Sequence, residues 1–271
     1  MSASPQATLI GGHGFVGRHL QTALTQAGWH YRVCGKNDPI PQQEDLGHVF
    51  YCAGLTANFR QHPFATVEAH VSLLSQVLQC CTFTSLTYLS STRVYSGAES
   101  TRENATLHVR SDVPGDLYNL SKLMGESLCL ASQRPVRIVR LSNVYGTQMP
   151  AQNFLAEILR ESAKTGRVLF RSARQSQKDY ISVQDVVRYL PLIALNGSQS
   201  IYNLASGSNM THASIAGFLE AQGVGCEFIA DAPVLTFPVI DTCKLFTEFG
   251  VAQHGLEKDL PALFSFYHEE S

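Results

Sequence analysis

The chain has 271 residues, with 20 Lys and Arg against 22 Asp and Glu, and 44% of its residues are hydrophobic. This is the composition of an ordinary globular protein, so it excludes a disordered or collagen-like chain. The net charge of −2 and the scattered basic residues offer no basic stripe, so we expect no nucleic-acid partner.

Short apolar runs alternate with helical patterns through the first half of the chain. We expect strands over residues 8–11, 31–34, 48–53, 86–90 and 136–141. We expect helices over 15–27, 63–80 and 117–131, and the second of these has an apolar stripe of Phe64, Val67, Val71, Leu74 and Leu78. This alternation predicts an α/β fold in which helices cover both faces of a parallel sheet.

The second half is less regular. We expect helices over 153–164, 185–195 and 214–221, and a strand over 201–205. Pro233, Pro238 and the glycine turns favour a smaller lobe packed on the sheet edge. We therefore predict a sheet core of residues 1–148, to which 181–205 return, and a smaller C-terminal lobe of 149–180 and 206–271.

The cysteines and the hydropathy pattern indicate a reducing compartment. Seven Cys, an odd number, occur without a C-x-x-C pair, so we expect reduced thiols and a cytoplasmic protein. The first ten residues lack a basic segment followed by an apolar one, which predicts no signal peptide. The longest apolar candidate, 186–195, is too short for a membrane span and contains Arg188, so we expect no membrane partner.

A glycine turn, GGHGFVG, lies between the first expected strand and the first expected helix. Its glycines Gly11, Gly14 and Gly17 allow a tight turn, a close approach of backbone N–H groups to a pyrophosphate, and close helix–strand packing. The spacing is G-x-x-G-x-x-G, and the alternative is a turn without a ligand. The flanking strand and helix favour a dinucleotide-binding core.

Tyr118 and Lys122 lie four residues apart in a helical pattern and therefore share a helix face. A nearby ammonium favours the phenolate, so such a pair can act as a general base. The alternative is that both residues lie on a helix surface, where this spacing is common. Ser90, Ser91 and Thr92 follow another strand, where they would either meet a substrate or only make turn hydrogen bonds.

Taken together, these residues resemble the extended short-chain dehydrogenase/reductases, and more narrowly the NAD-dependent epimerase/dehydratase family, which includes many nucleotide-sugar enzymes. The matching motifs occur in the order GGHGFVG, FYCAG, LSSTRVY, YNLSK, RLSNVYG, KDYISVQDVV and YNLASG. The resemblance implies a Rossmann-type doubly wound parallel sheet with a substrate-binding C-terminal lobe. It also implies, by analogy, a homodimer.

The resemblance carries roles onto particular residues. It makes Ser91 the catalytic hydroxyl, with Thr92 as the alternative, Tyr118 the acid/base, and Lys122 its activator and ribose ligand. Asp179 and Asp185 take structural roles. The implied cofactor-binding residues are Gly11, Gly14, Phe15, Val16, Gly17, Arg18, Lys36, Ala53, Gly54, Tyr118, Lys122 and Val144. The implied substrate-binding residues are Ser91, Thr92 and Asn143.

Three departures from the family pattern matter. Family dehydratases carry acidic residues where this chain has Thr92 and Arg93, so we do not expect a dehydratase. His70 stands where the family usually has Asn, and we interpret it as a buried structural histidine. The stretch 35–47 is too short for the family's usual extra strand, which predicts a narrower sheet or a loop around the adenine.

The cofactor preference follows from the end of the second strand. An acidic residue there usually binds the ribose of NAD, but this chain has Gly35 and Lys36, with Arg18 after the glycine turn. The cations favour NADP, although Asp38 could still bind a ribose, and both cations could simply be solvated.

We therefore expect an NAD(P)-dependent sugar epimerase or 4-keto-sugar reductase that acts on a nucleotide sugar. The alternative is a non-catalytic NAD(P)-binding sensor or assembly protein, which the retained Tyr118 and Lys122 disfavour. We expect no metal site, because the histidines and cysteines lack ligand spacing. The sugar and its nucleotide cannot be deduced from the pattern.

Overall fold

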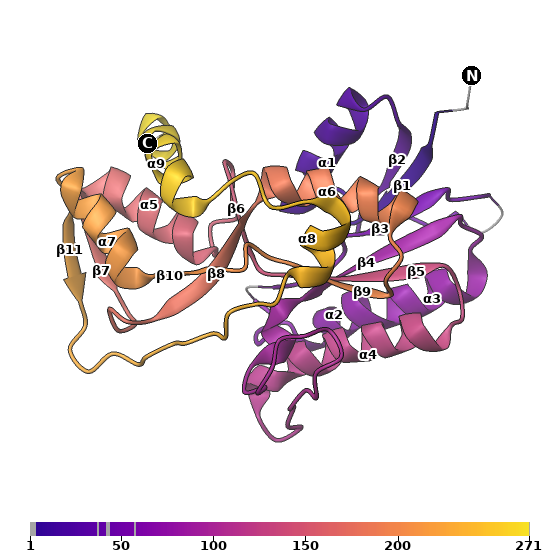
Figure 1. Ribbon diagram of the computed structural model, residues 1–271, viewed down its shortest axis with the longest axis horizontal. Helices are drawn as coiled ribbons and strands as arrows, with labels where there is room; N and C mark the ends of the chain where they lie inside the picture. The colour runs from indigo at the N-terminus through magenta and orange to yellow at the C-terminus, as the bar shows by residue number, and fades with distance from the viewer. Residues whose placement is uncertain (1–3, 37, 42–43, 57, 271) are drawn as a thin grey trace.

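The computed structural model describes residues 4–36, 38–41, 44–56 and 58–270 (Figure 1). Its centre is a six-stranded sheet in the order β2-β1-β3-β4-β5-β9, in which all paired strands run parallel. The strands are β1 (Gln6–Ile10), β2 (His30–Cys34), β3 (His48–Tyr51), β4 (Ser85–Ser91), β5 (Val136–Leu141) and β9 (Ile201–Leu204). The strand order reverses after β2, as in a doubly wound sheet, and this confirms the predicted fold class.

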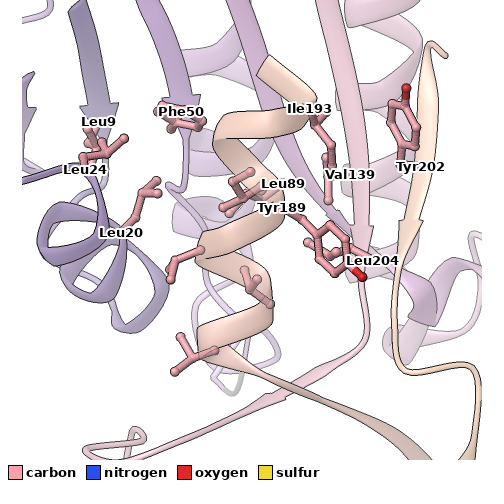
Figure 2. Packing of buried hydrophobic residues seen from close by; sticks show 14 of the residues in the cluster. Leu9, Leu20, Leu24, Phe50, Leu89, Val139, Tyr189, Ile193, Tyr202 and Leu204 are labelled. Carbon is pink, nitrogen blue, oxygen red and sulfur yellow. The ribbon is translucent and has the colours of Figure 1, made fainter. Parts of the chain in front are cut away.

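Helices cover both faces of this sheet (Figure 1). One face carries α1 (Phe15–Gln26) and α6 (Val183–Asn196), which form one apolar cluster with the strands. Figure 2 shows Leu20 and Leu24 of α1 and Tyr189 of α6 packed over the sheet. The other face carries α2 (Pro63–Val67), η1 (Glu68–Ser72), α3 (Leu73–Cys80) and α4 (Leu117–Ala131). Two 3₁₀ turns, η2 (Thr92–Tyr95) and η3 (Pro114–Asp116), precede α4.

The connection between β2 and β3 is short. Its described residues, 35–36, 38–41 and 44–47, contain no strand, and only an isolated bridge joins Asp45 to Thr82. The strand β2 therefore forms the sheet edge, as the length of this stretch predicts.

A second sheet lies beside the first and carries the lobe (Figure 1). It has the order β10-β8-β6, and a separate parallel pair joins β11 to β7. The strands are β6 (Asn143–Tyr145), β7 (Arg167–Phe170), β8 (Gln177–Ser182), β10 (Asn209–Thr211) and β11 (Gly225–Phe228). The helices are α5 (Phe154–Thr165), α7 (His212–Ala221) and α9 (Leu256–Glu269), whereas α8 (Cys243–Phe249) contacts β9. The exact boundaries of core and lobe, 1–148 with 181–205 and 149–180 with 206–271, stay a prediction.

Two buried aspartates hold loops at the junction of core and lobe. Asp179 accepts hydrogen bonds from the N–H groups of residues 206, 207 and 208, at 3.0, 2.8 and 3.1 Å. Asp185 accepts from the N–H groups of Gln253 and His254 and pairs with Arg188 at 3.1 Å. Both carboxylates are therefore committed to structure.

The helix predicted over 63–80 forms, but its apolar stripe is not buried along its whole length. Phe64 and Val67 are 89% and 37% exposed, whereas Leu74 and Leu78 are buried. The reason is the π-helical turn η1, whose extra residue per turn changes which face the following residues present. Among the described residues, no helix is both long and apolar enough to cross a bilayer.

Candidate active site

The glycine turn packs tightly against the end of β3. Gly11 has a φ of +77°, and a Cβ there would lie 2.7 Å from the backbone N of Ala53. A Cβ at Gly17 would overlap the carbonyl of Gly12. The helix α1 begins after Gly14, which has no side chain to cap it. Its first N–H groups thus face a cradle without side chains, which fits a pyrophosphate.

Lys122 of α4 reaches the same edge of the sheet from the opposite face. A Cβ at Gly54, which follows β3, would lie only 3.4 Å from Lys122 Nζ. The ammonium donates to the Leu89 carbonyl at 2.8 Å and is buried. Burial lowers the pKa of Lys122 to about 7, and the nearby carboxylate of Glu126 opposes this shift. Lys122 therefore stands beside the glycine cradle with a proton that can leave near neutral pH.

Tyr118 presents its hydroxyl one helical turn away. Its ring is buried, and the hydroxyl lies close to Ser91 at the end of β4 and to Thr56. Burial raises the pKa of the phenol, while Ser91, the charge of Arg93 and Thr56 lower it. The charge that lowers the pKa of the phenol here is that of Arg93, and the activating role expected for Lys122 stays a prediction.

Ser91 and Thr92 have different surroundings although they are adjacent. Ser91 caps the turn η2, because its Oγ accepts from the Arg93 N–H at 3.2 Å, and it also meets Tyr118. Thr92 lies inside the turn and is buried. Of the two candidate hydroxyls, Ser91 is thus the one beside the phenol.

His70 supports this edge from the π-helical turn η1. Its Nε2 accepts from the Leu55 N–H at 3.2 Å, and we therefore assign the ring proton to Nδ1, which lies 2.8 Å from Ser121 Oγ. Burial and the charge of Lys122 lower the pKa of His70 to about 2, so the ring is neutral. The histidine holds the loop after Gly54, which agrees with its interpretation as structural.

The remaining predicted residues lie in several different environments. Asn143 donates to the Asp179 carbonyl at 2.8 Å and is thereby tied to the lobe sheet. Phe15, Val16 and Val144 pack around the first apolar cluster, and a Cβ at Gly146 would lie 3.5 Å from the Phe15 ring. The exposed Arg18 donates to the His13 carbonyl at 3.2 Å, and Lys36 is exposed at the end of β2.

Sequence reasoning missed three residues around the phenol. Thr56 lies two residues after the FYCAG motif, so its position was a usable signal. The ring of Phe59 is buried with its centroid 5.4 Å from that of Tyr118, and Arg60 lies over Phe59 at 4.6 Å. Nothing in the sequence pattern brings Phe59 and Arg60 to the α4 helix. In the described part of the chain, no group of three His, Cys, Asp or Glu residues could hold a metal ion.

Comparisons with known proteins agree with this geometry. A model of the NAD dependent epimerase/dehydratase family matches residues 7–205. A search of curated proteins finds no match. Among solved structures, the chain is similar to TunA, an NAD-dependent NDP-hexosamine 5,6-dehydratase of tunicamycin biosynthesis, with 21% identity, a TM-score of 0.85 and 99% of each chain covered.

Two further structures show the same fold. A UDP-glucuronic acid 4-epimerase from Bacillus cereus is 16% identical, with a TM-score of 0.83 and coverage of 98% of this chain and 100% of that chain. RMD from Pseudomonas aeruginosa, in complex with NADPH, is 21% identical, with a TM-score of 0.79 and 99% of each chain covered.

Proposed function

Since the chain belongs to the NAD-dependent epimerase/dehydratase family, we propose that it transfers hydride at a hydroxyl-bearing carbon of a nucleotide sugar. The observation that carries this proposal is the convergence of three groups at one edge of the sheet. The Tyr118 hydroxyl meets Ser91, and Lys122 Nζ lies beside Gly54. Together they can hold an alcohol and exchange its proton.

The residues of the cradle fit a nicotinamide dinucleotide. Gly11, Gly14 and Gly17 would hold the pyrophosphate at the start of α1, and Gly54 leaves room for a ribose beside Lys122. A nicotinamide held there would supply the hydride chemistry, as acceptor when the substrate hydroxyl is oxidised to a carbonyl and as donor in the reverse direction.

Tyr118, once deprotonated, takes the proton of the substrate hydroxyl, and Ser91 donates a hydrogen bond to the same oxygen. Lys122 orients the ribose through its ammonium. In the reverse direction Tyr118 returns the proton to the carbonyl oxygen. The burial of the phenol excludes water from this exchange.

We propose an epimerase or a 4-keto-sugar reductase rather than a dehydratase. Elimination of water needs an acid/base pair, and the positions after Ser91 hold Thr92, which is buried in η2, and the cation Arg93. An epimerase turns its intermediate over before hydride returns, whereas a reductase exchanges its cofactor each cycle.

We propose NADP over NAD for this site. Arg18 and Lys36 are exposed, and neither makes an ion pair within the described residues, so both are available to a 2′-phosphate. Asp38 competes as a ribose ligand, but its carboxylate already accepts from the Gly35 N–H at 2.7 Å. Binding of both dinucleotides to the wild type and to Arg18→Gln tests this preference.

Two finer properties also belong to this proposal. Apolar side chains are exposed on α2 and α4, with Phe64, Met124 and Leu130 at 89%, 54% and 52%, which supports a homodimer through this face. All seven cysteines are unpaired, which supports a reducing compartment such as the cytoplasm.

The test is Tyr118→Phe, assayed for conversion of nucleotide sugars with NAD(P). We expect turnover to fall by about 100-fold or more, because a positioned acid/base contributes that much, while dinucleotide binding persists. Unchanged turnover would remove Tyr118 from the chemistry. Dinucleotide binding by a wild type that converts none of the sugars would instead favour the non-catalytic sensor or assembly protein.

A further inference from the structure

Two guanidinium groups lie together beside the candidate active site. The Cζ of Arg93 lies 5.0 Å from the ring centroid of Phe59 and 5.4 Å from that of Tyr118. The Cζ of Arg60 lies 4.6 Å from the same Phe59 ring. Two guanidinium groups thus contact the ring of the buried Phe59. Arg60 comes from the loop after β3, and Arg93 comes from η2.

Both groups also converge over Gly115, in the turn before α4. A Cβ placed there would lie 3.4 Å from Arg60 Nη2 and 3.8 Å from Arg93 Nη2. Arg93 Nη2 donates to the Gly115 carbonyl at 3.3 Å, which holds that side chain in place. The two guanidinium groups thus lie side by side at this glycine, each within van der Waals reach of a Cβ placed there.

The charge of this pair is not neutralised by the surrounding side chains. Neither Arg60 nor Arg93 makes an ion pair with any described carboxylate. Asp116 is the acidic group that acts on Arg93, but its oxygens accept from the Arg110 N–H and from Asn119. Burial and the charge of Arg60 lower the pKa of Arg93, which is the sign of two cations held close together.

A third cation faces the pair from the lobe. Lys178 of β8 lies over the Phe154 ring at 4.8 Å, and burial together with the charge of Arg93 lowers its pKa. His212, beside Phe154, stays neutral because burial lowers its pKa to about 4. Lys178 of the lobe is thus close enough to Arg93 for the two charges to act on each other.

We propose that Arg93, assisted by Arg60, binds a carboxylate on the sugar of the substrate, so that the protein selects nucleotide sugars of the uronic-acid type. Guanidinium groups bind carboxylates through two parallel hydrogen bonds, and the two groups lie together at Gly115 without a carboxylate partner among the described residues. Arg93 follows Ser91 by two residues and stacks on Tyr118, which places it against a substituent near the reacting carbon.

This inference rests on the proposed function for its sugar, but its test does not use turnover. Affinity is measured by calorimetry for two matched pairs: UDP-glucuronic acid with UDP-glucose, and GDP-mannuronic acid with GDP-mannose. We expect the wild type to bind the acidic member of at least one pair roughly tenfold more tightly, because hydrogen bonds to charged groups are the strong ones. Lack of this preference in both pairs overturns the proposal, whatever the enzyme assay shows.

The variants assign the preference to the arginine. We expect Arg93→Gln to remove it, with a change of less than threefold for the neutral sugar, and Arg93→Lys to restore part of it. Arg110→Gln removes an exposed charge of the neighbouring loop and is expected to keep the preference. Equal losses for both members of a pair in Arg93→Gln would mean that the arginine binds the shared diphosphate, and this result also overturns the proposal.

Discussion

Two cations are buried one turn apart along the helix α4, and their surroundings are opposite. Lys122 faces the cleft and donates to the carbonyl of Leu89. Arg140 of β5 meets the same helix one turn further on, where it binds both carboxylate oxygens of Glu126 at 3.0 and 2.6 Å. Both side chains are almost completely buried, so depth alone does not separate them.

The difference shows how one helix can serve both chemistry and stability. Burial lowers the pKa of Lys122 to about 7, because the carboxylate of Glu126 compensates the ammonium only in part. Burial also opposes the charge of Arg140, but Glu126 and Tyr95 outweigh it and raise the pKa. A partly compensated charge can titrate during a reaction, whereas a fully paired charge holds its neighbours in place.

The largest effect on stability is expected from breaking the ion pair between Arg140 and Glu126. Arg140→Met leaves the Glu126 carboxylate buried without its partner, so we expect the free energy of unfolding to fall by about 3–5 kcal/mol. Urea unfolding measures this change. The double variant Arg140→Met/Glu126→Leu, which removes both charges, is the control and is expected to recover much of the loss. If the free energy of unfolding of Arg140→Met lay within about 1 kcal/mol of that of the wild type, the ion pair would not be the stabilising counterpart of Lys122.

A pH scan tests the other cation. The pKa of Lys122 is about 7 in the folded state and 10.5 ordinarily, so between these values the unfolded chain binds more protons than the folded chain. The stability contributed at this site therefore rises with pH across that window and is constant below it.

Lys122→Met carries no titrating group at this position. Its stability relative to the wild type is thus expected to be highest at or below about pH 7 and to decline toward about pH 10, as measured by urea unfolding. Arg110→Gln, which changes an exposed loop residue and keeps both Lys122 and Glu126, serves as the control. A difference between Lys122→Met and wild type that stays constant with pH would mean that the ammonium keeps an ordinary pKa.

The smallest effect on stability is expected at the hydrogen bond between His70 and Ser121, two neutral side chains near Lys122. Ser121→Ala removes the partner of His70 Nδ1, and we expect a loss of about 1–2 kcal/mol because a buried N–H is left unpaired. Ser72→Ala, on the exposed side of the same π-helical turn, is the matched control and should change stability by less than about 0.5 kcal/mol. Equal effects in both variants would show that His70 is not held by Ser121.

The sequence predicted the central sheet better than the lobe, for physical reasons. Strands of the parallel sheet are buried on both faces and read as apolar runs, such as Val49, Phe50 and Tyr51 of β3. Lobe strands such as β6 and β10 have three residues each and pair across long chain separations, so no local period reveals them.

The candidate site likewise has residues that the sequence pattern could predict and residues that it could not. Tyr118 and Lys122 share a helix, and their spacing placed them on one face. The link between Arg93 and Tyr118 depends on the 3₁₀ turn η2 and on Phe59, which arrives from another loop. Such contacts between loops leave no periodic trace in a single sequence.

The route of the chain between the two sheets limits how this protein can be rebuilt. It leaves the central sheet after β5 for β6, returns from β8 into α6, and leaves again after β9 for β10. Neither half is one continuous piece of polypeptide. A chimera that exchanges the lobe must therefore be spliced at several joints at once, and relatives are expected to diversify by changing loops and not by swapping a cassette.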